Sequence, residues 1–155
     1  MLKNFREVVE VKEVFKKHNN AVIFPYGSAT WSIKPLSDKG FQKRFDVLMK
    51  PYKRLAAKGK VDEERCSELL AVALSETIVT GWEGVYIDKE DMNEDFPNWK
   101  YKANEEGQCK VPYSRENCCL ILSHVNYKDL LLWVKDMSTS EADYIIKTEK
   151  DNAKN

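Results

Sequence analysis

The chain has 155 residues, of which 43% are hydrophobic, and its 25 Lys and Arg residues balance 25 Asp and Glu residues. A chain of this length can bury the core of one domain without disulfides or metals, and its neutrality excludes a general electrostatic attraction to nucleic acid or to an anionic membrane. No apolar run approaches the roughly 20 residues that span a bilayer, and the N-terminus lacks the apolar core of a signal peptide, so we expect a cytoplasmic protein.

Residues 1–20 are compatible with two structures. Phe5, Val8 and Phe15 would lie on one face of a helix, whereas the run from Val8 to Val11 suits a strand. We expect mixed or extended structure here, at the start of a single domain that covers residues 1–150.

Residues 21–25 and 30–34 are short runs rich in β-forming side chains. The four residues between them, from Tyr26 to Ala29, predict the loop of a β-hairpin. Trp31 and Ile33 would then share one face. That face needs a helix on top of it, because a lone hairpin is not stable in water.

The first helix is predicted from Ser37 onward, because its apolar residues recur at spacings of three and four. Pro51 lacks an amide donor and clashes with the preceding turn, so we expect a kink or a break at Lys50, followed by an end at Gly59. The apolar stripe consists of Phe41, Phe45, Leu48, Tyr52 and Leu55.

The second helix has a well-defined start. Asp62 is the predicted N-cap, and Glu63 and Glu64 complement the positive first turn. The apolar face continues to Ile78, and Gly81 is the expected C-cap.

Residues 83–111 form a polar, acidic and aromatic segment without a helical period. Its length indicates a functional or disordered insertion. Tryptophan residues commonly anchor a core, but aromatic residues among charges also suit a protein interface. The predicted protein-binding residues of this segment are Phe96, Trp99 and Tyr101.

Three helices are predicted after the insertion. Ser114 caps the first, Asn126 caps the second, and Ser138 with Glu141 forms a capping box for the third. The polar end from residue 147 is expected to fray, with residues 151–155 as a tail. The predicted fold class is therefore α+β, mostly α, with an N-terminal β-hairpin packed on a bundle of about five helices.

Charge is unevenly distributed along the chain. Residues 34–60 hold nine basic residues against Asp38 and Asp46, whereas residues 83–95 hold six acidic residues against Lys89. The two segments are either solvated surfaces or attract each other, within one molecule or head to tail between copies. A basic helix also makes non-specific phosphate contacts, but the neutrality of the whole chain argues against nucleic acid as a partner. The basic residues predicted to bind protein are Lys43, Arg44, Lys53 and Arg54.

The sequence contains no catalytic motif. There is no Gly-rich phosphate loop, H-E-x-x-H or G-x-S-x-G sequence, and the two histidines lie in a polar run at His18 and at a predicted helix end at His124. The cysteines match no disulfide framework and no paired zinc motif, which favours reduced, buried thiols at Cys66, Cys109, Cys118 and Cys119. We expect a non-enzymatic protein without a metal site or a cofactor.

Two segments resemble a family of small tailed-phage proteins, the tail assembly chaperones encoded between the major tail-tube protein and the tape-measure protein. One runs from Glu76 to Val85 and the other is Pro-Tyr-Ser-Arg-Glu-Asn, from Pro112 to Asn117. The similarity extends over residues 21–146. The residues that carry its turn and helix-start motifs are Gly81, Trp82, Gly84, Pro112, Tyr113, Ser114 and Asn117.

The resemblance implies a non-enzymatic role in the host cell cytoplasm. A protein of this family binds the tape-measure protein and keeps it soluble while tube subunits assemble, with the major tail protein as a further candidate partner. Self-association is also implied, so that several copies coat one client. The insertion at 83–111 is longer than the short acidic turn of the family.

Two other functions are compatible with the same sequence. The first is a structural tail-completion or head–tail connector protein that is retained in the virion. The second is a phage protein that acts on a host factor through the aromatic insertion.

Overall fold

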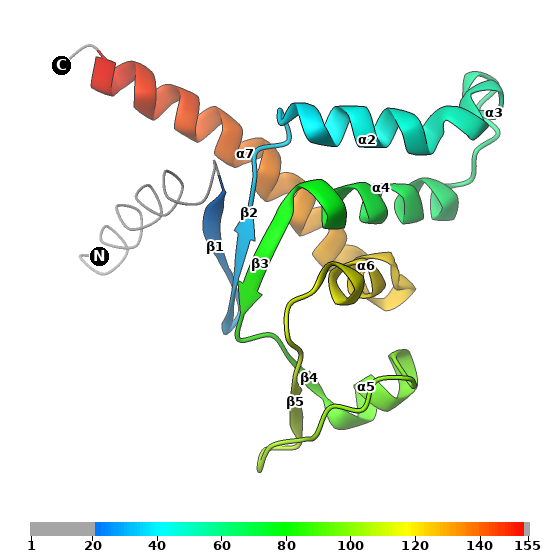
Figure 1. The fold of residues 1–155 in the computed structure, drawn as a ribbon, viewed down its shortest axis with the longest axis vertical. Coiled ribbons are helices and arrows are strands. Elements are labelled where there is room, and N and C mark those ends of the chain that lie inside the picture. Colours follow the sequence, from blue (N-terminus) through cyan, green and yellow to red (C-terminus); the bar gives the residue numbers. More distant parts are fainter. Residues whose placement is uncertain (1–20, 154–155) are drawn as a thin grey trace.

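The computed structural model describes the backbone of residues 21–153 and the side chains of residues 21–140. The expectations for residues 1–20, including His18, lie outside the described residues. Figure 1 shows a three-stranded sheet beside a set of helices, with a second, two-stranded sheet at one end. The predicted class, α+β and mostly α with an N-terminal hairpin packed on helices, is confirmed.

Strands β1 (Val22–Tyr26) and β2 (Ala29–Ile33) form the predicted hairpin. The turn is tighter than the expected four-residue loop, because Tyr26 pairs with Ala29 and only Gly27 and Ser28 connect the strands. Gly27 has a φ of 60°, which this kind of short turn requires. Trp31 and Ile33 are both buried, as predicted.

The helix predicted from Ser37 is broken at Lys50, as expected from Pro51. Helix α2 (Lys39–Met49) begins at Asp38, whose carboxylate accepts a hydrogen bond from the Gly40 N–H, and is followed by the 3-10 helix η1 (Lys50–Tyr52) and by α3 (Lys53–Ala57). Pro51 lies in the first turn of η1, where a missing amide donor costs nothing. Gly59, with a φ of 65°, follows α3 at the predicted end.

Helix α4 (Glu63–Thr77) begins as predicted, with the Asp62 carboxylate accepting a hydrogen bond from the Arg65 N–H at 2.6 Å. The predicted C-cap at Gly81 is wrong, because α4 ends at Thr77 and Gly81 lies inside strand β3 (Val79–Glu83). The β-branched residues that follow Thr77 favour a strand, and β3 pairs antiparallel with β2. The strand order is β1-β2-β3.

The segment 83–111 carries regular structure, which the sequence analysis did not predict. It contains β4 (Tyr86–Asp88), α5 (Lys89–Asp95) and β5 (Gln108–Lys110), and the two strands pair antiparallel. Helix α5 escaped prediction because it has about two turns and buries a single side chain, Met92.

Helix α6 (Arg115–Ser123) starts at the predicted cap, where Ser114 Oγ accepts a hydrogen bond from the Asn117 N–H. The predicted cap at Asn126 is wrong. Asn126 lies inside the 3-10 helix η2 (Val125–Tyr127), and the N-cap of that element is His124.

Helix α7 (Lys128–Ala153) is one continuous helix where two were predicted. Ser138 is buried within it and its hydroxyl donates a hydrogen bond to the Lys135 carbonyl oxygen, so the expected capping box does not form. The Ser138 carbonyl oxygen accepts a hydrogen bond from the Leu36 N–H, which ties α7 to the connection between β2 and α2. The helix also runs through residues 147–153, where fraying was expected.

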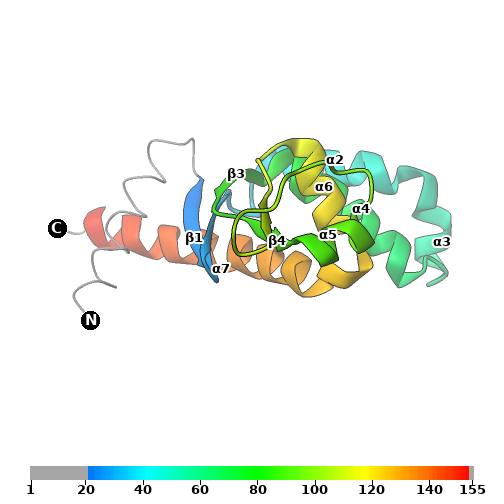
Figure 2. The same ribbon diagram turned by 90° about the horizontal axis from the view of Figure 1, so that it is seen from below.

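Helix α7 covers the apolar face of the three-stranded sheet. The Trp133 ring lies 4.6 Å from the Tyr26 ring and 6.3 Å from the Trp31 ring, measured between centroids, and Figure 2 shows α7 running past the hairpin. Trp31 lies directly opposite Trp82 of β3, with the two ring centroids 4.8 Å apart. On the other side of the core, α4 packs against α2 and α6. Among the helices that the structure describes, none combines the length and the apolar character needed to cross a membrane.

Candidate functional site

A groove of about 390 Å³ opens where the hairpin turn, the β3–β4 connection, α6 and the start of α7 meet. This volume lies within the range of roughly 300–1,000 Å³ that is usual for binding pockets. We name it the tyrosine groove. Its lining residues are Tyr26, Gly27, Ser28, Ala29, Trp31, Gly84, Val85, Tyr86, Ile87, Ile121, Asn126, Tyr127, Asp129 and Leu130.

Gly84 allows two walls of the tyrosine groove to approach each other. Its φ is 71°, and a Cβ atom at this position would lie 3.1 Å from the Ser28 carbonyl oxygen and 3.6 Å from the Ala29 Cα. A side chain here would therefore push the β3–β4 connection away from the hairpin turn. The predicted turn role of Gly84 thus has a specific geometric basis.

Two tyrosines stand at the edge of the tyrosine groove. Tyr26 is 40% exposed and Tyr86 is 42% exposed, although both are large side chains with apolar rings. The Tyr26 ring is supported by Trp133 of α7, and the strand of Tyr86 is held by pairing with Lys110 of β5. Rigid, partly exposed aromatic rings with few rotatable bonds are suited to anchoring a protein partner.

The floor of the tyrosine groove is apolar and its charged lining residue is an acid. Trp31, Ile121 and Leu130 are buried beneath it, whereas Asp129 is exposed on the first turn of α7. The groove therefore offers apolar contact together with one carboxylate, a combination that favours an apolar segment flanked by a cation.

Asp95 fixes the wall that contains Tyr127. Its carboxylate accepts hydrogen bonds from Asn126 Nδ2 at 2.9 Å and from the Tyr127 hydroxyl at 3.2 Å, and His124 Nε2 lies 3.8 Å away. Burial, together with the neighbouring Asp95 charge, raises the pKa of Tyr127 and keeps its phenol protonated. His124 Nδ1 accepts a hydrogen bond from the Asn126 N–H, so both ring nitrogens of this histidine face structural partners.

The structure brings together the residues of the two sequence motifs. The Trp82 indole donates a hydrogen bond to the Val111 carbonyl oxygen, and the Tyr113 hydroxyl donates one to the Val79 carbonyl oxygen. The Asn117 amide donates to the Pro112 carbonyl oxygen and to the Tyr101 hydroxyl, both at 3.0 Å. These contacts join β3, the 83–111 segment and α6, so the motif residues specify the fold around the tyrosine groove.

The aromatic residues predicted to bind protein are directed inward. Phe96 is 6% exposed and stacks on Trp99 with ring centroids 4.2 Å apart. Trp99 and Tyr101 are partly buried against the same core, and the Tyr101 hydroxyl is occupied by Asn117. Phe96 is therefore not accessible to a partner in this structure, because the segment uses its aromatic side chains to pack onto the domain, whereas protein binding by Trp99 and Tyr101 stays a prediction.

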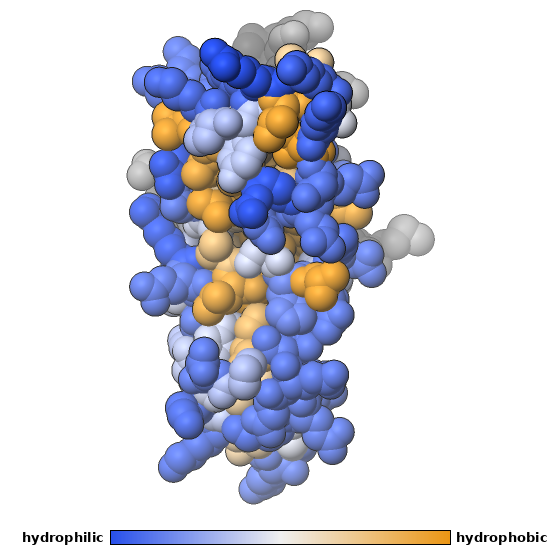
Figure 3. Space-filling view, turned by 90° about the vertical axis from the view of Figure 1, so that its right-hand side faces the viewer, coloured by the Kyte–Doolittle hydropathy of each residue, from blue (hydrophilic) through white to orange (hydrophobic). Residues whose placement is uncertain are grey.

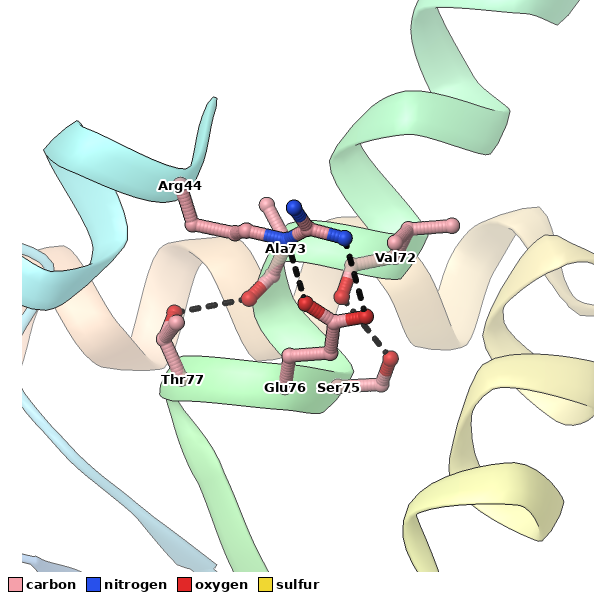
Figure 4. Close-up of polar contacts among 6 residues, drawn as sticks. All are labelled: Arg44, Val72, Ala73, Ser75, Glu76 and Thr77. Carbon is pink, nitrogen blue, oxygen red and sulfur yellow. Dashed lines mark hydrogen bonds and ion pairs between the residues drawn. The ribbon is translucent and has the colours of Figure 1, made fainter. Parts of the chain in front are cut away.

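The predicted basic residues lie on α2 and α3 but differ in accessibility. Lys43, Lys53 and Arg54 are exposed. Arg44 is half-buried and its guanidinium binds the Glu76 carboxylate of α4, in the arrangement shown in Figure 4. Arg44 therefore joins α2 to α4 and is not free for a partner.

The basic segment 34–60 and the acidic segment 83–95 do not pair within the molecule over the part of the chain that the structure describes. The recorded ion pairs of Arg44 and Asp95 lead to Glu76 and His124 instead. In Figure 1, α3 and α5 lie at different ends of the fold. Among the described residues, no ion pair therefore joins the two segments, and the intermolecular interpretation stays a prediction.

The cysteines are free thiols. Cys109 and Cys118 are buried, and Cys66 and Cys119 are partly exposed. Burial raises the pKa of the Cys118 thiol, which keeps it in the unreactive protonated form. Within the described residues, no group of three or more His, Cys, Asp or Glu side chains is placed to hold a metal ion.

Sequence reasoning missed Tyr26, Tyr86 and Asp129 as surface residues. The sequence places Tyr26 in the hairpin loop and Tyr86 in the aromatic insertion, and the exposure of either side chain depends on the strand pairing. The available signal was the exposed hairpin turn itself, because a large aromatic residue beside a two-residue turn has little core to enter.

Residues 36–155 match the model of a family described as YdaY prophage protein. The chain belongs to the YdaY prophage protein family. The matched range begins after the hairpin and includes α2 through α7. A search of curated proteins and a search of solved structures found no match. Membership of this family confirms the phage derivation expected from the motifs, and it is not specific to tail assembly chaperones.

Proposed function

We propose that this YdaY-family protein is a non-enzymatic phage morphogenesis factor, a tail assembly chaperone that binds the tape-measure protein in the host cell cytoplasm. The observation that carries the proposal is the tyrosine groove, in which Tyr26 and Tyr86 expose about two-fifths of their surface beside an apolar floor. Family membership supports a phage function for such a site.

A tape-measure protein is long and helical, and its apolar faces must be shielded before tube subunits surround it. An amphipathic helix binds a groove by placing residues spaced at i, i+3 and i+4 against apolar walls. The tyrosine groove supplies such walls from two separate elements, the hairpin turn and β4. Asp129 at its side would favour client segments with a Lys or Arg next to the apolar residues.

The test is co-expression with the tape-measure protein of the same prophage, followed by affinity capture and quantification of the soluble client. The variant Tyr26→Ser/Tyr86→Ser removes both exposed rings. We expect it to weaken client binding by about tenfold or more, because buried aromatic anchors dominate interface energies. The matched control is Leu132→Ser, which removes an apolar side chain that is 53% exposed on α7 and does not line the groove.

Mass spectrometry of purified virions separates the chaperone from its main competitor. A chaperone leaves the assembled tail, so its peptides should be absent from virions. A soluble client complex that is insensitive to the double tyrosine substitution would refute the groove as the binding site. Presence of the chain in virions without any soluble complex would identify a structural connector instead.

A further inference from the structure

Helix α3 is exposed along its whole length. None of the residues from Lys53 to Ala57 is buried, and Leu55 is 45% exposed. A helix of this length gains almost nothing from its own hydrogen bonds and normally depends on apolar packing. No residue of α3 is buried against the part of the chain that the structure describes, so Leu55 gives the helix a partly exposed apolar face.

The surroundings of this face are cationic. Lys50, Lys53, Arg54, Lys58 and Lys60 are all exposed, and residues 50–60 contain no acidic residue. Three acids follow: Asp62 caps α4, and Glu63 and Glu64 lie in its first turn, where they interact favourably with the helix N-terminus. We name residues 50–60 the α3 tip: an apolar side chain, Leu55, set among positive charges.

The tyrosine groove is complementary to the α3 tip in both respects. Tyr26 and Tyr86 give it apolar, partly exposed rings, and aromatic faces also attract Lys and Arg side chains. Asp129 gives it a negative charge at the position where α7 begins. Leu55 follows directly after Lys53 and Arg54. Its apolar side chain could contact the tyrosine rings while one of these cations pairs with the carboxylate of the groove.

A single molecule cannot fill its own groove with its own α3 tip. Figures 1 and 2 place α3 at the outer end of the α2–α4 pair, away from the hairpin turn and β4. The end face in Figure 3 carries apolar side chains among hydrophilic ones in its upper part, over α3, and is mostly hydrophilic lower down, over α5. The α3 tip and the tyrosine groove therefore lie too far apart to meet within one molecule, so they can meet only between two copies.

We propose that the α3 tip of one copy docks into the tyrosine groove of a second copy, head to tail. The inference rests on the groove being the protein-binding site of the proposed function, and it adds a regulation of that site. Such a contact joins different surfaces of the two partners, so it propagates into rings or open chains. In the absence of a client, copies occupy one another's grooves, and a client segment must displace the tip to bind.

Sedimentation velocity over a range of protein and salt concentrations tests the contact without any client. We expect the wild type to form oligomers that grow with protein concentration and dissociate as salt is raised, since the contact includes exposed charges. The tip variant Leu55→Asp and the groove variant Asp129→Lys should each sediment as a monomer. Leu132→Asp is the control and should behave as wild type, because Leu132 is 53% exposed, against 45% for Leu55, and lies outside both surfaces.

Mixing the two monomeric variants gives the sharpest result. The Leu55→Asp chain keeps an intact groove and the Asp129→Lys chain keeps an intact tip, so the mixture should form a one-to-one heterodimer that does not grow further. Circular dichroism of each variant checks that it remains folded. A wild type that stays monomeric at all concentrations, oligomers that survive either substitution, or a mixture without heterodimer would overturn the head-to-tail contact.

Client capture with the Leu55→Asp variant separates the two proposals. This variant retains Tyr26, Tyr86 and Asp129, so it should bind the tape-measure protein at least as well as wild type. Loss of self-association without client capture by any variant would defeat the proposed function and leave the copy-to-copy contact standing. Client capture that depends on the tyrosines, in a chain that never self-associates, would defeat the copy-to-copy contact and leave the proposed function standing.

Discussion

The indole N–H of Trp82 donates a hydrogen bond of 2.8 Å to the carbonyl oxygen of Val111. The two residues bracket the 83–111 segment, and the bond is buried. Because the Val85 carbonyl oxygen also accepts the Val111 N–H at 2.9 Å, both ends of the segment are held at one point beside the tyrosine groove. Strand β4, which carries Tyr86 at the edge of the groove, begins directly after Val85 and is therefore positioned by these two hydrogen bonds.

Replacing Trp82 with Phe should destabilise the protein by about 1–3 kcal/mol, because the buried Val111 carbonyl oxygen loses its hydrogen-bond donor while most of the apolar ring is kept. Urea unfolding followed by far-UV circular dichroism measures this loss. An unchanged free energy of unfolding would show that the indole hydrogen bond contributes nothing to the closure.

Gly84→Ala should cost about 1–3 kcal/mol, because it adds a Cβ atom 3.1 Å from the Ser28 carbonyl oxygen at a φ of 71°. Gly27→Ala is the matched control, since Gly27 also has a positive φ but a Cβ there would meet nothing within 4 Å. Thermal unfolding of both variants separates backbone strain, common to the two, from the close approach that only Gly84 makes. Equal losses would contradict the close-approach argument.

The raised pKa of Tyr127 predicts a loss of stability in alkaline solution. An unfolded tyrosine titrates near pH 10, so above that pH the unfolded chain releases its proton before the folded one does, and the free energy of unfolding decreases as the pH rises towards the folded pKa. Below about pH 10 the contribution is fully present. Urea unfolding between about pH 8 and 11 should show a shallower decline for Tyr127→Phe than for wild type.

A residual slope should remain in Tyr127→Phe, because burial also raises the pKa of Tyr113. Adding Tyr113→Phe should reduce it further. Identical pH profiles for wild type and the double variant would contradict the assignment of the alkaline transition to these phenols.

Glu76→Gln should destabilise the protein by about 1 kcal/mol or less, because its ion pair with Arg44 is more than a third exposed and water screens it. The effect should shrink as salt is added. Glu68→Gln, which removes an even more exposed pair with Arg65 on the same helix, provides the comparison and should have the smaller effect. A loss that does not change with salt would indicate packing of the side chain rather than charge.

Local signals predicted what local interactions determine. Asp62 and Ser114 are predictable as N-caps because each needs only a backbone N–H three residues ahead, and Pro51 is predictable as a break because its own ring excludes a continuous helix. The predictions of a C-cap at Gly81 and a capping box at Ser138 are wrong because distant contacts determine the structure there. Each has the composition of a helix boundary, but sheet pairing with β2 and burial within α7 decide their structures.

The candidate site was the least predictable part of the molecule. Tyr26, Tyr86 and Asp129 come from three elements far apart in sequence, and the tyrosine groove exists only once the hairpin turn meets Gly84. Phe96 and Trp99 looked like surface residues because acids and lysines surround them in sequence. In space, the Phe96 ring lies next to Trp99, His124 and Tyr127, and the Trp99 ring lies between Phe96 and Tyr101.

The pairing of Trp31 with Trp82 gives the protein an internal optical reporter. Two indoles with centroids 4.8 Å apart couple their electronic transitions, which produces a paired signal in the circular dichroism spectrum that separate tryptophans lack. The signal requires β2 to lie against β3, and these strands are separated in the chain by α2, α3 and α4. The appearance of this signal during refolding would therefore report when the hairpin pairs with β3 and brings α2, α3 and α4 together in the loop between them.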